Sequence, residues 1–98
     1  MSEPIADQRV EPSPDVLTQR LPDGDLVLLD LATERYFGLD STGTAMWETL
    51  EATCDVGQAH ARLAERFDVD PEVLRRDLDT FVGRLAAKGL LRRGDHPA

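Results

Sequence analysis

The stretch RYFGLDSTGTAMWETL, residues 35–50, joins a predicted strand to a predicted helix within one short segment. Arg35 to Leu39 is rich in aromatic and apolar side chains, which favour an extended strand. Asp40 or Ser41 then caps a helix that runs to about Ala52 and has apolar residues near helical spacing. None of these side chains suits catalysis. The function of this segment therefore depends on what lies beside the strand at 35–39.

Two further strands are predicted upstream of this segment. Val16 to Leu21 ends at Pro22-Asp23-Gly24, a strong turn signal. Leu26 to Leu31 follows, and Ala32-Thr33-Glu34 turns the chain into the strand at 35–39. Connections this short require antiparallel pairing, so we expect a three-stranded meander. Residues 1–13 carry two of the six prolines and little apolar periodicity, which predicts a disordered arm.

Two more helices are predicted downstream. Asp55 and Gln58 fit a capping box at the start of the first. Its apolar stripe consists of Val56, Ala59, Leu63 and Phe67. The second has Asp70 as N-cap, Pro71 in the first helical position and Glu72 near the positive end of the helix dipole. Its apolar stripe consists of Leu74, Leu78, Phe81 and Leu85.

The predicted fold class is therefore α+β and winged-helix-like, a three-stranded antiparallel sheet followed by three helices. The last two helices are joined by Asp68 to Asp70 only, the length of a helix-turn-helix joint. Gly89 fits the left-handed residue that ends a helix, and the nine residues after it are too few for a hairpin wing. We expect one domain over residues 14–91 and a flexible tail at 92–98.

Composition and charge narrow the class of protein. Hydrophobic residues make up 41% and charged residues 31%, as in soluble globular chains. The N-terminal segment has no apolar core, so no signal peptide is expected and the protein is predicted to be cytoplasmic. Residues 1–69 hold 14 acids and 5 bases, while residues 70–98 hold 5 acids and 6 bases. The net charge of −8 favours a basic partner or a basic peptide.

The sequence does not predict an enzyme, a metal site or a cofactor. The single cysteine, Cys54, could pair with His60 or His96 as a nucleophile. However, Cys54 is expected in a short turn and His60 on a mostly polar helix. Two histidines and one cysteine match no zinc template, and no glycine-rich nucleotide loop occurs.

DNA binding through the last helix is an alternative that the helix-turn-helix joint raises. This helix carries Arg75, Arg76 and Arg84, but three acids interrupt them: Glu72, Asp77 and Asp79. A chain with a net negative charge also repels the negatively charged phosphates of DNA. A plain interaction module that dimerises through its edge strand is a further alternative.

The strand at 35–39 favours another hypothesis. Each outer strand of a three-stranded meander has a free edge unless another segment covers it. An extended peptide could add to this edge through main-chain hydrogen bonds, and the last helix would line the resulting groove. Alternatively, Tyr36 and Phe37 simply divide between core and surface, and the charges of the edge protect it from pairing.

Two sets of residues resemble the PqqD-like family. The first is Tyr36-Phe37-Gly38-Leu39-Asp40 followed by Gly43, Trp47 and Leu50. The second is Asp77-Leu78, Phe81-Val82, Leu85 and Gly89-Leu90-Leu91. The resemblance covers residues 14–91. Members of this family are RiPP recognition elements, which bind the leader of a ribosomally made precursor peptide.

The resemblance implies that the leader adds beside the third strand and packs against the third helix. The implied peptide-binding residues are Glu34, Arg35, Tyr36, Phe37, Gly38, Leu39, Val73, Leu74, Asp77, Leu78, Phe81, Arg84 and Leu85. Asp77 falls where the family often has an acid, and leaders frequently carry lysines; it could instead be a solvated residue or pair with Arg84. Leu78, Phe81 and Leu85 could also belong to the core.

One flank of the last helix must be chosen as the groove wall. We expect the flank with Val73, Asp77 and Arg84 rather than the flank with Arg75, Asp79 and Val82 to face the peptide. Trp47 and Gly43 have structural interpretations instead: Trp47 as a core anchor, Gly43 as the point where the first helix approaches the third strand closely.

The implied role is that of a non-catalytic adaptor without a cofactor. A free-standing chain resembles the lasso peptide version of the family, which works with a separate leader peptidase. The alternative within the family is the pyrroloquinoline quinone precursor chaperone, which delivers its peptide to a radical SAM enzyme.

Overall fold

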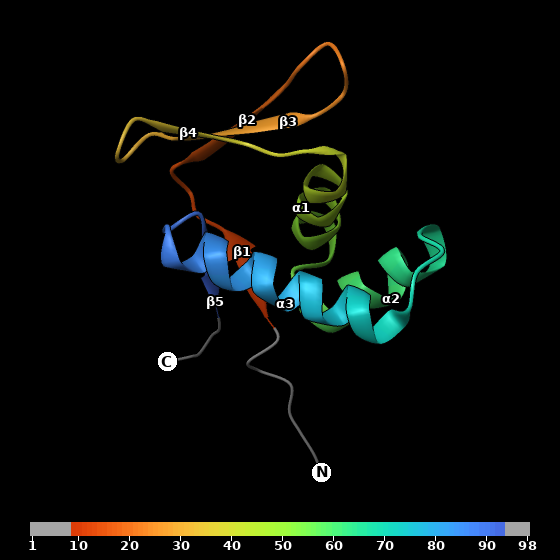
Figure 1. Cartoon of the computed structure of the whole chain (residues 1–98). Helices are drawn as coiled ribbons and strands as arrows, with labels where there is room; N and C mark the ends of the chain where they lie inside the picture. The colour runs from red at the N-terminus through yellow and green to blue at the C-terminus, as the bar shows by residue number, and fades with distance from the viewer. Residues whose placement is uncertain (1–8, 94–98) are drawn as a thin grey trace.

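The structure, a computed structural model, describes residues 9–93 (Figure 1). Its elements are β1 (Val10–Pro12), β2 (Val16–Arg20), β3 (Leu26–Asp30), β4 (Arg35–Gly38), α1 (Ser41–Thr53), α2 (Val56–Arg66), α3 (Pro71–Ala87) and β5 (Leu91–Arg93). The predicted α+β class is confirmed, because three helices follow a three-stranded antiparallel sheet. In the described part of the chain, no helix is long and apolar enough to cross a membrane.

The three-stranded sheet has the order β2-β3-β4, with both pairs antiparallel. Gly24 supplies the positive φ of the β2–β3 turn, at 97°. The β3–β4 turn is held by Asp30, whose carboxylate accepts hydrogen bonds from the Ala32 N–H and the Thr33 hydroxyl, each at 3.0 Å. These local turns fix the register that pairs Leu28 with Phe37.

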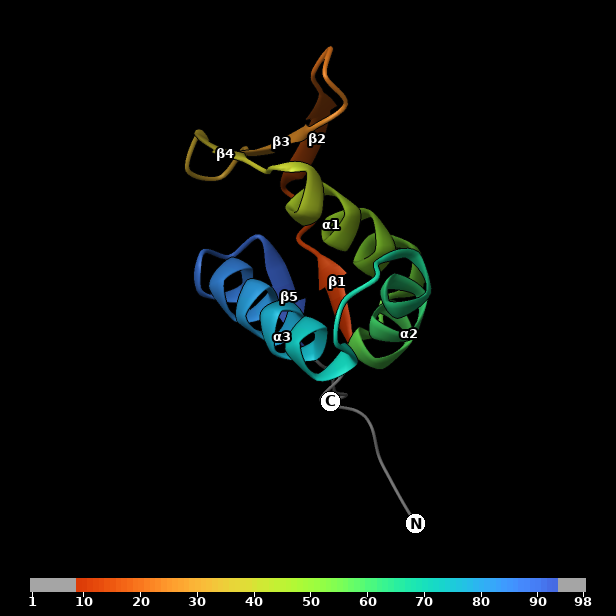
Figure 2. The same ribbon diagram turned by 45° about the vertical axis from the view of Figure 1, so that its right-hand side comes forward.

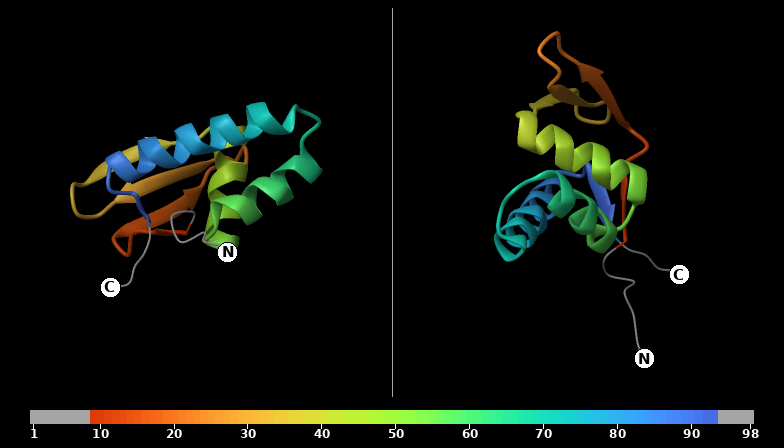
Figure 3. Two further views of the ribbon diagram at one scale, coloured as in Figure 1. Left: turned by 90° about the horizontal axis from the view of Figure 1, so that it is seen from below. Right: turned by 90° about the vertical axis from the view of Figure 1, so that its right-hand side faces the viewer.

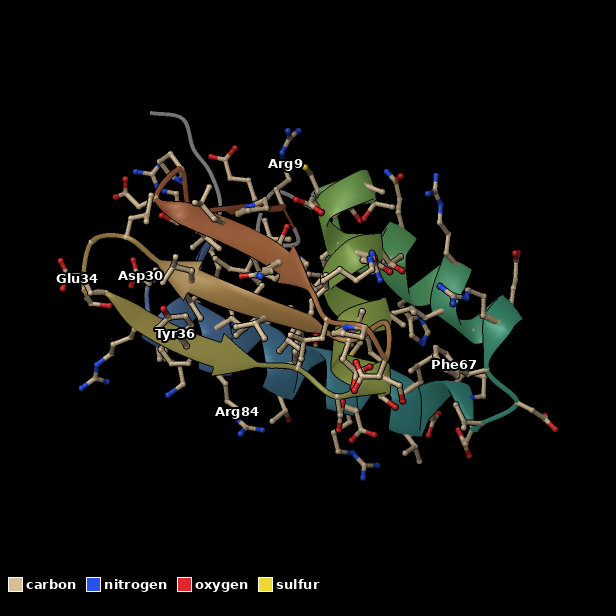
Figure 4. The ribbon with its side chains drawn as sticks, turned by 90° about the horizontal axis from the view of Figure 1, so that it is seen from above. Arg9, Asp30, Glu34, Tyr36, Phe67 and Arg84 are labelled. Atoms are coloured by element: carbon tan, nitrogen blue, oxygen red, sulfur yellow. The ribbon has the colours of Figure 1, made fainter. Side chains whose placement is uncertain are left out.

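The two faces of this sheet differ in character. Leu26 and Leu28 are buried on the face that the helices cover. The opposite face carries one apolar cross-strand row, in which Leu17 pairs with Leu29 and Leu29 pairs with Tyr36. Gln19, Val27 and Gly38 form the next row. This outer face, which lies in front of the helices in Figure 4, therefore presents no charged strand residue.

Aspartates start all three helices. The carboxylate of Asp40 accepts a hydrogen bond from the Gly43 N–H at 2.7 Å. The carboxylate of Asp55 accepts one from the Gln58 N–H at 2.9 Å, and that of Asp70 accepts one from the Glu72 N–H at 2.8 Å. Each bond satisfies a backbone N–H that the helix itself leaves free. The helix starts predicted from the sequence are thus confirmed.

The core lies where α1, α2 and α3 meet each other and the inner face of the sheet (Figures 2 and 3). Trp47 is 1% exposed and is the largest fully buried side chain, as expected of a core anchor. The other fully buried large side chains are Leu28, Leu50, Leu63, Leu78, Val82 and Leu90. After α3, Gly89 takes a φ of 78° and turns Leu90 and Leu91 back into this core.

The chain ends correct two expectations. β1 pairs with β5 in a two-stranded antiparallel sheet, and Val10 is only 3% exposed. The predicted disordered arm at 1–13 is therefore wrong for residues 10–12, and the predicted flexible tail at 92–98 is wrong for residues 92 and 93. Residues 1–8 and 94–98, with His96, lie outside the described residues. Strands of three residues that pair across the length of the chain leave no local pattern to recognise.

Candidate functional site

A groove with a volume of about 410 Å³ lies between β4, the start of α1 and α3. Figure 1 shows β4 above α3, with the two elements running in opposite directions. The residues that line the groove are Phe37, Gly38, Leu39, Asp40, Thr42, Gly43, Met46, Asp77, Thr80, Phe81, Arg84, Leu85 and Lys88.

The strand that borders this groove has an open edge. β4 pairs with β3 on one side, and within residues 9–93 no strand pairs with its other side. The Leu39 N–H donates to the Leu26 carbonyl at 2.9 Å. Because ladder bonds alternate with a period of two, the N–H of Phe37 also faces β3. The N–H and C=O groups of Tyr36 and Gly38 therefore face the open edge.

The floor of the groove is apolar. Phe37, Leu39 and Phe81 are partly buried and pack against the core. Gly43 allows a close approach here, because a Cβ at this position would lie 3.4 Å from Leu39 Cβ and 3.5 Å from Phe81 Cε1. The predicted close approach of α1 thus involves α3 as well as the segment after β4.

Charged side chains line the two ends of the groove. Asp40 and Asp77 lie toward the start of α1, where Gly43 approaches Phe81. Arg84 and Lys88 lie toward the other end, and Lys88 Nζ sits 5.2 Å from the centroid of the Phe37 ring. Among residues 9–93 the ion pairs are Arg20–Glu48 and Arg75–Asp79, so Asp77 and Arg84 do not pair with each other.

Seven of the thirteen residues predicted for the site line the groove: Phe37, Gly38, Leu39, Asp77, Phe81, Arg84 and Leu85. Glu34, Arg35 and Tyr36 do not line it. Glu34 lies in the β3–β4 turn, Arg35 is the first residue of β4, and Tyr36 is 71% exposed on the outer face of the sheet (Figure 4). Tyr36 contributes only backbone groups to the open edge.

Some of the α3 residues predicted to form the groove wall border the groove, and others belong to the core. Leu74 and Leu78 are buried in the core and do not line the groove, and Val73 lies exposed outside it. On the opposite flank, Val82 is buried and Arg75 binds Asp79 through Nε at 3.1 Å. The flank that carries Asp77 and Arg84 is the one that borders the groove.

Six groove residues were missed by sequence reasoning: Asp40, Thr42, Gly43, Met46, Thr80 and Lys88. Asp40 and Gly43 had been assigned only structural roles. Thr42 and Met46 come from the first turns of α1, whose polar and apolar residues do not show which helix they face. Lys88 follows the end of α3, and no local sequence pattern places it over the ring of Phe37, which is 51 residues earlier in the chain.

The side chains considered for catalysis bind elsewhere. Cys54 Sγ lies 3.7 Å from the Glu51 carbonyl, and His60 Nε2 lies 2.8 Å from the Pro71 carbonyl. Within residues 9–93 no group of three His, Cys, Asp or Glu side chains could hold a metal ion. What the groove offers is main-chain hydrogen bonding, an apolar floor and charges.

Comparison with protein families gives a match to the family described as coenzyme PQQ synthesis protein D (PqqD) over residues 25–91. The chain belongs to the PqqD family. The match begins just before β3 and ends at the start of β5, so it includes the entire groove of this PqqD family member.

Solved structures similar to this PqqD family member include TbiB1 in complex with the TbiA(beta) leader peptide. The two share 32% identity with a TM-score of 0.79, over 88% of this chain and 99% of that one. A lasso peptide synthetase B1 complexed with the leader peptide has the same fold at 20% identity, with a TM-score of 0.76 over 86% and 98% of the two chains. No curated protein gives a significant match.

Proposed function

We propose that this protein binds the leader segment of a ribosomally made precursor peptide as an extra strand on β4. The open edge of β4 beside the groove carries this proposal. Tyr36 and Gly38 supply outward backbone donors and acceptors, and α3 supplies the wall against which alternate peptide side chains pack. A related protein at 32% identity forms a complex with a leader peptide, which supports the same ligand class here.

The protein acts as a non-catalytic adaptor in this proposal. Holding the leader extended keeps the attached core peptide at high effective concentration near a separate processing enzyme. We propose a leader peptidase of the lasso peptide type, because the similar solved structures include a lasso peptide synthetase B1. We place the adaptor and this enzyme together in the cytoplasm.

A second candidate function is delivery of the pyrroloquinoline quinone precursor to a radical SAM enzyme. The description of the matched family favours it. The two candidates use the same groove and differ in the peptide and in the enzyme that receives it.

The first test is fluorescence anisotropy with a labelled leader peptide from the precursor encoded nearest to this gene. We expect saturable binding with a Kd below about 1 µM and no binding of a scrambled leader. Tyr36→Pro removes one outward N–H while leaving the β3–β4 ladder intact, so the Kd should rise roughly tenfold or more.

Tyr36→Ala is the matched control, because it removes the side chain but keeps the backbone N–H. It should bind nearly as well as the wild type. If Tyr36→Pro, shown to be folded by the fluorescence of Trp47, binds the leader as tightly as Tyr36→Ala does, then strand addition to β4 is wrong.

A further inference from the structure

The groove is polarised along its length, and this polarity constrains the peptide. Asp77 and Asp40 make one end acidic, while Arg84 and Lys88 make the other end basic. Between them the lining is apolar or uncharged. Part of the Asp40 carboxylate is occupied by the Gly43 N–H at 2.7 Å, so Asp77 is the more available acid.

The direction of β4 relative to this polarity is fixed by two contacts. Phe37, within β4, lies beneath Lys88 at the basic end. Leu39 and Asp40, which follow β4, lie beside Gly43 at the acidic end. β4 therefore runs from the basic end toward the acidic end. A peptide added antiparallel to β4, the more stable arrangement for paired strands, runs from the acidic end toward the basic end.

The distance between the acidic and basic ends of the groove determines how far apart the charged residues of the peptide must be. Asp77 is separated from the midpoint of Arg84 and Lys88 by roughly 13 Å of helix at 1.5 Å per residue. Four residues of extended strand span a similar distance, roughly 13 Å. Side chains of a strand alternate between faces, so residues i, i+2 and i+4 of the peptide point into the groove together.

From this geometry we infer that the groove selects the pattern base-x-apolar-x-acid, read from the N-terminus of the bound segment. This inference rests on the proposed function and specifies its substrate class. The base meets Asp77, the apolar residue packs on Phe81 and Leu39, and the acid meets Arg84 and Lys88. The groove thereby sets the direction in which the peptide binds as well as its affinity.

The test selects phage-displayed random decapeptides on the immobilised protein. The decisive variant combines Asp77→Arg, Arg84→Asp and Lys88→Gln, which reverses the charges at the two ends that the peptide meets and changes the net charge by one. The matched control is Arg75→Asp with Asp79→Arg, an exchange on the opposite flank of the same helix that preserves an ion pair four residues apart. Thermal unfolding establishes that both variants are folded.

We expect base-x-apolar-x-acid among the peptides enriched by the wild type and by the control, and acid-x-apolar-x-base among those enriched by the polarity variant. Synthetic peptides of the two patterns should differ in Kd by roughly fivefold for each mismatched charge. Enriched peptides without charge order, or with an order that the polarity variant does not reverse, overturn this inference and leave the proposed function standing. Failure to enrich any peptide over an unrelated protein overturns both.

Discussion

At the scale of single residues, the aspartate at the start of each helix stabilises the fold by accepting a hydrogen bond from the backbone. Asp40, Asp55 and Asp70 each bind a backbone N–H of the first helical turn. The position of Asp55 is tightly constrained, because only Cys54 and Asp55 lie between the end of α1 at Thr53 and the start of α2 at Val56. Cys54 ends α1 in the left-handed conformation, at a φ of 54°, and the Asp55 cap then starts α2.

Replacing this cap should measurably weaken the fold. Asp55→Ala should lower the free energy of unfolding by about 1 kcal/mol, since it leaves the Gln58 N–H without its carboxylate acceptor. Urea unfolding followed by Trp47 fluorescence measures this change, because Trp47 is the single tryptophan and is buried. Asp68→Ala, at an exposed position between α2 and α3, should change stability by less than roughly 0.5 kcal/mol. Equal losses in both variants would contradict the capping role.

At the scale of elements, β1 and β5 join the two ends of the described chain. Val10 packs into the core, its N–H donates to the Cys54 carbonyl at 3.1 Å, and β1 pairs along β5. The short pair thus ties the beginning of the chain to the end of α1 and to the segment after α3.

Removing the side chain that anchors β1 tests this connection. Val10→Ala should lower the free energy of unfolding by about 2 kcal/mol, from lost apolar burial and the cavity that remains. The same urea titration measures it. Glu11→Ala, at the exposed neighbouring position of β1, is the control and should leave the midpoint nearly unchanged. A Val10→Ala midpoint equal to that of the wild type would show that β1 adds no stability.

The elements that the sequence predicted and those it did not predict differ in one physical respect. The strands β2, β3 and β4 and all three helices are bounded by local signals, such as the turn at 22–24 and the cap at Asp70. The pairing of β1 with β5 depends on contacts between distant segments. The site shows the same division: a helical stripe identifies Leu78 and Phe81 as inward-facing, but only packing shows that Leu78 is core and Phe81 is groove.

At the scale of the whole molecule, the net charge of −8 makes the folded chain repel itself. Two ion pairs form among residues 9–93, and both are largely exposed. They therefore offset little of this repulsion.

Salt should therefore stabilise the protein. Raising NaCl from about 20 mM to about 500 mM shortens the Debye length well below the size of the domain and should raise the Tm by roughly 3 °C at neutral pH. Differential scanning calorimetry measures the shift. The shift should vanish near the isoelectric point, at pH 4.5. A Tm that falls with NaCl at neutral pH would mean that attractive pairs dominate instead.

The uncharged outer face of the three-stranded sheet meets the open edge of β4 along one border of the molecule. Sheets usually protect such a border with charged side chains or a covering segment, because an open edge invites pairing with other chains. If a leader peptide occupies β4, the cargo itself closes the border. The loaded adaptor would then be the form that resists aggregation, while the empty form would be exposed to it. The amount of available leader peptide would thus determine how long the protein stays free of aggregation.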